Sequence, residues 1–263
     1  MSINMSKKHL TVKNLDGNNL TDVMNLQDRI IASLNDDEQH FILHRTERDY
    51  MESLNGKSSH MIGVFDKDEL IAQIVYKTPH NNEQRDIPEY KPNIENENLV
   101  IYEAILVDPS YRGASLMQRM LEHIEATELE NQRTTALIQI AIDNPASWIN
   151  ALHHGMQITK VDLDPTDGVK VLYLEKNLVP TPSKPLHIQD NIKTYNMYLG
   201  DDIHKKIPPL FMKMQHLISK GYKGIGLNKE TKSLVWQKAE RVKTKFTLYD
   251  IMNYKKYQKT GTI

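Results

Sequence analysis

The segment 105–116 combines residue types and spacing that could bind a phosphate-bearing ligand. An apolar strand is predicted to end at Val107, a turn follows at 108–110, and a long helix is predicted from about 112 to 130. The first N–H groups of a helix have no acceptor within the helix and lie at the positive end of its dipole. This junction therefore predicts a site for an anion such as pyrophosphate.

The residues at the start of the predicted helix favour the same chemistry. Gly113, Ala114 and Ser115 are small, so an anion could approach the backbone closely, and Arg112 adds a permanent charge with a planar set of donors. A simpler interpretation stays open, because any junction of strand, turn and helix can contain Arg-Gly without binding a ligand. The surrounding elements must therefore decide what this segment does.

The elements around this segment predict a mixed α/β (α+β) domain. Strands are predicted at 10–15, 60–66, 69–77, 99–107, 135–142, 157–163 and 169–174. Helices are predicted at 21–33, 48–54, 112–130 and 144–155. This order of strands and helices is typical of a sheet flanked by helices.

The chain resembles the GNAT superfamily of N-acetyltransferases in three places. They are the Val-x-Pro-x-Tyr-Arg-Gly sequence at 107–113, the long helix that follows, and Asn144 with Ala151 and Gly155 downstream. The resemblance covers residues from about 8 to 178. It implies a mixed, mostly antiparallel central sheet flanked by helices. It also implies transfer of an acetyl group from acetyl-CoA to an amine by direct attack within a ternary complex.

The resemblance further implies where acetyl-CoA would bind. The backbone of 105–107 would pair with the pantetheine arm, the amides of 112–117 would hold the pyrophosphate, and Asn144 would steady the cofactor. A backbone N–H near Leu106 or Val107 would polarise the thioester carbonyl. The predicted cofactor-binding residues are Ile105, Leu106, Val107, Arg112, Gly113, Ala114, Ser115, Leu116, Met117 and Asn144.

The sequence departs from the family pattern in two respects. Ser115 and Met117 stand where the phosphate loop usually has further small residues. Ala151 stands where the family often has a tyrosine that protonates the departing CoA thiolate. A thiol has a pKa of roughly 8.5, so the thiolate can leave without a strong acid. The departure therefore removes the usual assignment of the acid without excluding turnover.

Three other residues are candidates for proton transfer. Glu103, four residues before Val107, could accept the proton that an ammonium must lose before attack, or it could be a paired charge. His153 and His154 could replace the missing tyrosine, since histidine titrates near neutrality, or they could be charges at a helix C-terminus. The histidines show no metal-ligand spacing, so no metal site is predicted.

Composition excludes several classes of protein. The 263 residues are 39% hydrophobic and 25% charged and include no cysteine, which excludes a disulfide framework, a thiolate zinc site and an acyl-cysteine intermediate. The N-terminus lacks the apolar core of a signal peptide, and no apolar run approaches the roughly 18 residues that span a bilayer. A soluble, cytoplasmic protein is expected.

Charge is distributed unevenly along the chain. Residues 1–179 carry a net charge of −11 and residues 180–263 a net charge of +10. A proline-rich linker is predicted at 179–186, between a GNAT-like domain (1–178) and a small basic α+β region (187–263). In that region a helix is predicted at 208–220, a hairpin at 224–237 and a last helix at 248–257. The basic region could dock on its own acidic domain, bind an anionic partner or membrane surface, or be solvated.

Alternatives for the partner and the function follow from this asymmetry. The acidic balance of 1–179 favours a cationic acceptor such as a polyamine, an aminoglycoside or a lysine side chain, and the polar segment 79–98 would line the acceptor side. A second hypothesis is a catalytically weak CoA-binding module whose basic region recruits an anionic protein or nucleic acid. The lysines for nucleic-acid binding would be Lys205, Lys206, Lys213, Lys220 and Lys223, near Phe211 and Tyr222. The oligomeric state stays open, with a dimer possible in principle.

Overall fold

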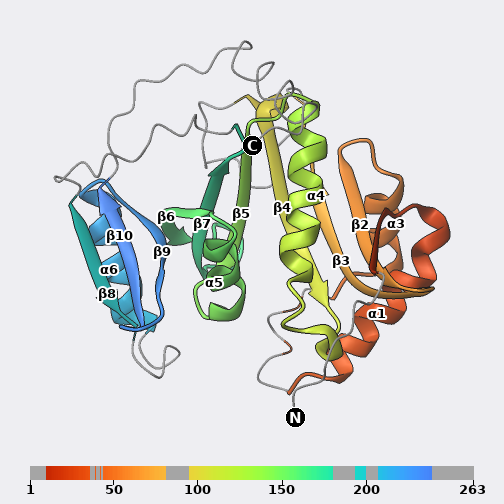
Figure 1. The fold of residues 1–263 in the computed structure, drawn as a ribbon, viewed down its shortest axis with the longest axis horizontal. Coiled ribbons are helices and arrows are strands. Elements are labelled where there is room, and N and C mark those ends of the chain that lie inside the picture. The colour runs from red at the N-terminus through yellow and green to blue at the C-terminus, as the bar shows by residue number, and fades with distance from the viewer. Residues whose placement is uncertain are drawn as a thin grey trace, which may run out of the picture.

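One ten-stranded sheet organises the described part of the chain (Figure 1). A computed structural model describes residues 10–35, 39, 42, 44–80, 95–179, 193–199 and 207–238. The strands are β1 (Leu10–Asn14), β2 (Ser59–Asp66), β3 (Glu69–Lys77), β4 (Leu99–Val107), β5 (Thr135–Ala141), β6 (Gln157–Leu163), β7 (Lys170–Asn177), β8 (Thr194–Tyr198), β9 (Tyr222–Asn228) and β10 (Ser233–Lys238). The α-helices in these residues are α1 (Leu20–Ala32), α3 (Glu47–Asn55), α4 (Leu116–Glu130), α5 (Pro145–His153) and α6 (Ile207–Ser219).

The sheet is mixed and mostly antiparallel, which confirms the predicted class of fold. The strand order is β1-β2-β3-β4-β5-β7-β6-β9-β10-β8. Within the described strands, β4 and β5 form the single parallel pair, and every other neighbouring pair is antiparallel. α4 supplies the crossover that a parallel pair requires.

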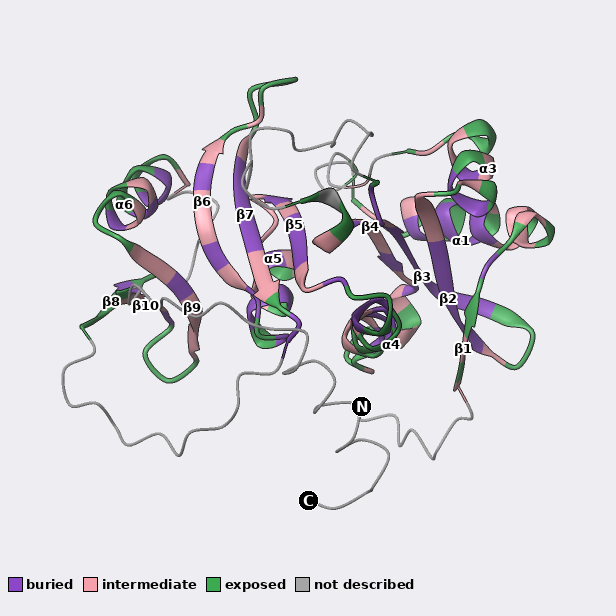
Figure 2. Ribbon diagram, turned by 90° about the horizontal axis from the view of Figure 1, so that it is seen from above, coloured by how far each residue is buried: buried purple, intermediate pink, exposed green. Residues whose placement is uncertain are grey.

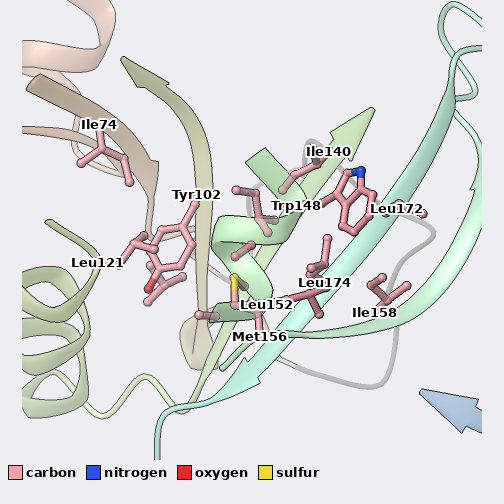
Figure 3. Close-up of a cluster of buried hydrophobic side chains, with 14 of the residues drawn as sticks. Ile74, Tyr102, Leu121, Ile140, Trp148, Leu152, Met156, Ile158, Leu172 and Leu174 are labelled. Atoms are coloured by element: carbon pink, nitrogen blue, oxygen red, sulfur yellow. The ribbon is translucent and has the colours of Figure 1, made fainter. Parts of the chain in front are cut away.

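Helices cover both faces of the sheet. α4 and α5 lie on one side, and α1 and α3 lie on the other (Figure 2). The predicted apolar stripe of α4 is buried as expected, with Leu116, Met120, Leu121 and Ile124 at most 2% exposed. Figure 3 shows side chains of α4, α5 and the central strands packed together in this core.

The C-terminal strands belong to the same sheet. β9 pairs with β6 through Ile158 and Gly224. A Cβ added to Gly224 would lie 3.1 Å from Cδ1 of Ile158, so a side chain at this position would require Ile158 to shift by a few tenths of an ångström. Lys223 Nζ of β9 lies 2.8 Å from Glu175 Oε1 of β7, the strand on the other side of β6. Met214 and Trp236 are fully buried and belong to the same continuous hydrophobic cluster as side chains of α4 and α5.

The sequence predicted most of these elements within a few residues. The helix and hairpin of the C-terminal region are confirmed as α6, β9 and β10. Strand β8 was missed because Met197 is its one buried residue, so it lacks the alternating apolar pattern that marks a strand. The predicted helix at 248–257 and the linker from 180 onward lie outside the described residues. None of the helices in the described ranges is long and apolar enough to cross a membrane.

Candidate active site

A buried turn at Asp108 directs the chain out of β4. The Asp108 carboxylate accepts hydrogen bonds from the backbone N–H of Ser110 at 2.9 Å and from Arg29 Nε at 3.3 Å. Its own backbone N–H donates to the carbonyl of Ile71 at 2.9 Å. Asp108 is 8% exposed, so these bonds satisfy a carboxylate that would otherwise be costly to bury. They fix where the chain emerges from the sheet.

The helix predicted from about Arg112 begins instead at Leu116. Residues Pro109–Tyr111 form a short 3-10 helix, and Arg112 has extended backbone with φ −59° and ψ 147°. Gly113 has φ +80° and Ser115 has φ +56°. Left-handed residues cannot continue a right-handed α-helix, so 112–115 form a loop that leads into α4.

This loop leaves a run of backbone donors without protein acceptors. No described residue accepts a hydrogen bond from the backbone N–H of Gly113, Ser115, Leu116, Met117 or Gln118. A Cβ added to Gly113 would meet no atom within 4 Å, so the space in front of it is open. When left-handed residues precede a helix N-terminus, several backbone N–H groups are directed toward one point, where a single anion can accept hydrogen bonds from them.

Two of the predicted cradle amides are used by the loop itself. The N–H of Arg112 donates to the carbonyl of Pro109, and the N–H of Ala114 donates to the carbonyl of Tyr111, both at 3.3 Å. The side chain of Arg112 is exposed, and no described residue forms an ion pair with it. Arg112 would therefore act on an anion through its guanidinium, and Ala114 would act through its small size.

Strands β4 and β5 separate next to this loop. They pair from Leu99 with Thr135 to Tyr102 with Ile138, and pairing then stops, although β4 continues to Val107. Beyond Tyr102, β4 keeps β3 as a neighbour on one side, while none of the described strands pairs with its other side. The backbone at 105–107 therefore has an open edge to which an extended ligand could add as a strand.

A bulge in β4 lies where this separation begins. Ile74 pairs with Ile105 and Tyr76 pairs with Tyr102, so β4 has one more residue than β3 in this interval. The Tyr102 hydroxyl donates to Glu125 Oε1 of α4 at 3.3 Å, so this side chain is directed to the α4 face. A bulge redirects side chains and backbone N–H groups, and it is common beside active sites.

Glu103 lies in this bulge and is held by two cations. Its Oε2 accepts from Arg45 Nη2 at 2.7 Å, and its Oε1 lies 2.8 Å from Lys77 Nζ. The side chain of Glu103 is 17% exposed, that of Arg45 13% and that of Lys77 30%. Glu103 is therefore a paired charge, and its role as a base stays a prediction.

A buried polar network holds Arg45 in place. The Gln27 side chain accepts from the N–H of Arg45 and donates to its carbonyl, both at 2.9 Å. The Tyr50 hydroxyl donates to the same Gln27 oxygen at 2.9 Å and accepts from Gln73 Nε2 at 3.0 Å. Burial raises the pKa of Tyr50 to about 12, so this hydroxyl stays neutral as a hydrogen-bonding group.

Asn144 and Ala151 mark the two ends of α5. Asn144 caps the helix, because its side-chain oxygen accepts from the backbone N–H of Ser147 at 3.2 Å. Ala151, at the position of the missing tyrosine, is fully buried in the core. The cap explains Asn144 structurally and leaves its predicted role toward a cofactor as a prediction.

The structure separates the two candidate histidines. His153 is exposed at the end of α5, whereas His154 is buried with Nε2 2.8 Å from Glu125 Oε1 and 3.1 Å from Lys176 Nζ. Lys176 Nζ also lies 2.7 Å from Glu125 Oε2. Burial favours a higher pKa for Glu125, but hydrogen bonds from His154 and Lys176 outweigh it and lower the pKa. His154 thus joins α5 to α4 and β7.

Sequence reasoning missed the partners of these residues. Arg45 and Glu103 are 58 positions apart, and no sequence pattern links either of them to Lys77. A weak signal did exist for Arg45, because it precedes a helix-capping box formed by Thr46 and Asp49. The described residues include no group of three or more histidines, cysteines or acidic residues that could hold a metal ion.

The comparisons with known proteins concern the family and the fold. The Acetyltransferase (GNAT) family model matches residues 27–155, which include β4, the loop at 112–115 and α5. None of the curated proteins compared matches the chain significantly.

Several solved structures share the fold. The ribosomal-protein-S18-alanine N-acetyltransferase of Escherichia coli is 13% identical with a TM-score of 0.50, covering 66% of this chain and 97% of that one. An N-acetyltransferase of Staphylococcus aureus is 13% identical with a TM-score of 0.51, covering 65% of this chain and 99% of its own. Arabidopsis thaliana NAA60, in complex with acetyl-CoA, is 11% identical with a TM-score of 0.50, covering 64% and 98%.

The fold is the mixed α/β sheet with flanking helices that these acetyltransferase structures share. Residues 27–155 identify this part of the chain as an acetyltransferase of the GNAT family, whose acyl donor is acetyl-CoA. At these identities the solved structures show the shared fold alone.

Proposed function

We propose that this chain transfers the acetyl group of acetyl-CoA to a primary amine of a small molecule or protein by direct attack in a ternary complex. The observation that carries this proposal is the set of open amides at Gly113 and at 115–118, beside the edge of β4 that no described strand covers beyond Tyr102. Open amides before a helix suit a pyrophosphate, and an open strand edge suits an extended pantetheine arm, so the two features together fit CoA. No covalent enzyme intermediate is needed.

The donor would bind through backbone and small side chains. Amides of Gly113, Ser115, Leu116 and Met117 would hold the pyrophosphate, with the Arg112 guanidinium beside it and Ala114 leaving room. The arm would run along Ile105–Val107 toward the bulge, and Asn144 would contact it from the start of α5. A backbone N–H near Leu106 or Val107 would stabilise the oxyanion as the tetrahedral intermediate forms.

Glu103 would accept the proton that the acceptor ammonium loses. Its carboxylate faces away from α4, so it can receive a proton directly or through water from an amine on that side. The CoA thiolate would leave without a dedicated tyrosine. His153 is exposed and remains a candidate to protonate the thiolate, as does His154, although Glu125 and Lys176 already contact Nε2 of His154.

The acceptor would be an amine that is cationic in solution. The net charge of −11 over residues 1–179 favours its approach, and we assign the segment 79–98 to the acceptor side. We also propose that the chain works in the cytoplasm, and that residues 1–178 form the catalytic unit to which the basic region 187–263 is joined by 179–186.

Calorimetry with acetyl-CoA, together with thiol release measured over a panel of amines, tests this function. We expect saturable binding and release of free CoA with at least one class of amine. Glu103→Gln should slow release, whereas Glu52→Gln on the exposed surface of α3 serves as the matched control. Absence of acetyl-CoA binding at millimolar concentration would contradict the proposal.

A second function is favoured by the buried Ala151. Without the usual acid, the domain could bind CoA with little turnover while the basic C-terminal region recruits an anionic partner. Lys213 on α6 and Lys220 just after it are exposed and belong to that region. Binding of CoA without thiol release on any amine would support this alternative. Nucleic-acid affinity that falls steeply with salt would identify the partner as nucleic acid, and salt-independent or absent binding would exclude it.

A further inference from the structure

A cluster of one acidic and two basic side chains, joined by ion pairs, lies on the face of β4 opposite α4. It consists of Arg45, Lys77 and Glu103, and each Glu103 oxygen contacts one of the cations, at 2.7 and 2.8 Å. All three side chains keep some contact with solvent, at 13%, 30% and 17% exposure. The cluster holds two positive charges and one negative charge, so its net charge is positive.

The cluster lies where an acceptor would meet the thioester. Glu103 is in the bulge that immediately precedes the unpaired part of β4. Its neighbour Tyr102 is directed to α4, the helix that begins at the phosphate loop, while Glu103 contacts Arg45, just before α3 on the other face. The donor would reach the gap from the α4 side, so the opposite side is left for the acceptor.

Arg45 is held rigidly and retains an unused donor. Its backbone is fixed by both groups of the Gln27 amide, and its Nη1 donates to Ser53 Oγ at 3.3 Å. Its Nε is buried without a hydrogen-bond partner. A positioned guanidinium with a spare N–H suits a carboxylate, which can accept from two of its nitrogens.

We propose that this cluster binds an acceptor that is a zwitterion, an α-amino acid or a similar amine with an adjacent carboxylate. The acceptor carboxylate binds Arg45 and Lys77, and its ammonium binds Glu103. This inference rests on the proposed acetyltransferase function and narrows its substrate class. A polyamine is disfavoured because its second cation would lie against Arg45 or Lys77, and like charges in contact discriminate strongly between ligands.

The same arrangement explains which group accepts the proton that the acceptor ammonium must lose. The ammonium gives a proton to Glu103, the free amine attacks the thioester carbonyl carbon, the new C–N bond forms and the C–S bond breaks. CoA leaves as thiolate and takes up a proton to become the thiol. Overall, one ammonium and acetyl-CoA give one amide, CoA thiol and one released proton.

Thiol release with matched acceptors tests the inference. The panel contains α-amino acids, their carboxamides, the amines that lack the carboxylate, and diamines. We expect kcat/KM for the preferred amino acid to exceed that of its carboxamide at least tenfold. This matches the loss of one hydrogen bond between charged groups, expected to be roughly 10-fold to 100-fold.

Substitutions in the cluster test which side chains bind the acceptor carboxylate. Lys77→Met should raise KM for the amino acid about tenfold and change KM for the carboxamide less than twofold. Arg45→Lys keeps the charge but removes the Nε–H, and should also raise KM for the amino acid selectively. Arg48→Met is the matched control, since Arg48 pairs with Glu52 on the exposed face of α3, and it should change neither KM.

Two outcomes would overturn the inference while the proposed function stands. One is release with diamines or carboxamides at rates equal to those with amino acids. The other is an equal change of both KM values in Lys77→Met. No release with any amine would contradict the inference together with the function. Melting temperatures of the variants separate a loss of folding from a loss of recognition.

Discussion

Gly113→Ala, compared with Gly221→Ala, tests the proposed phosphate role of the loop at 112–115 against a control glycine with the same φ. Both glycines have φ +80°, and at both positions an added Cβ would meet no atom within 4 Å. Gly113 lies in the loop before α4, whereas Gly221 follows the end of α6. The two substitutions therefore impose similar backbone strain and differ in whether the new methyl group projects into the candidate anion site.

The magnitudes follow from this geometry. An L-residue in the left-handed region costs roughly 1–2 kcal/mol, which lowers the melting temperature of a chain of this size by about 2–8 °C. We expect that loss in both variants. In Gly113→Ala the methyl group also displaces the anion from one amide, which costs about 1.5–3 kcal/mol for a bond to a charged group. The dissociation constant for acetyl-CoA should therefore rise roughly 10-fold to 100-fold.

Calorimetric titration with acetyl-CoA and thermal melting without ligand measure the two effects separately. We expect both variants to melt earlier and Gly113→Ala alone to bind acetyl-CoA weakly. Unchanged acetyl-CoA affinity in a folded Gly113→Ala protein would refute the assignment of this loop to the pyrophosphate. Equal loss of affinity in both variants would show that strain, rather than the site, explains the change.

Three further predictions concern proton transfer and the buried networks. Glu103→Gln should lower kcat by roughly 100-fold or more without changing KM for acetyl-CoA, and a change below twofold would remove Glu103 as the base. Hydrogen bonds from His154 and Lys176 outweigh burial and lower the pKa of Glu125 below its ordinary value of 4.5. Its charged form therefore stabilises the folded state above that value, and this contribution is lost as pH falls through the lower folded-state pKa. Acid-induced loss of melting temperature should be shallower in Glu125→Gln than in the parent, and parallel curves would contradict this. Tyr50→Phe should lower the free energy of unfolding by about 1–3 kcal/mol in denaturant titrations, because two buried glutamines lose a partner, and a cost below 0.5 kcal/mol would argue against the network.

The sequence by itself determined those helices and strands whose residues show a clear apolar periodicity bounded by turn residues. The run at 99–107 is apolar and bounded by a turn, and β4 has those same bounds in the structure. The hairpin of β2 and β3 was predicted from two apolar runs around a polar turn, and the stripe of α4 from residues spaced three and four apart. These signals are local because side-chain period and turn chemistry depend on neighbouring residues.

Tertiary structure alone decided the conformation of the loop at 112–115. Ser115 adopts a left-handed conformation that a residue other than glycine seldom takes, so the sequence placed the helix start three to four residues too early. The sequence also contained no sign that β8, β9 and β10 would continue the central sheet. The pairing of β9 with β6 brings Gly224 against Ile158, and these residues are 66 positions apart in the chain.

The charge pairs were likewise decided by the fold. Arg45, Lys77 and Glu103 come from three separate segments, and the pairing of Glu125 with His154 joins two helices. Periodicity in a sequence shows which face of an element is buried, but it does not show which other element covers that face. Glu103 and His154 were therefore candidates from the sequence, whereas their partners Arg45, Lys77 and Glu125 became visible only when the fold brought distant segments together.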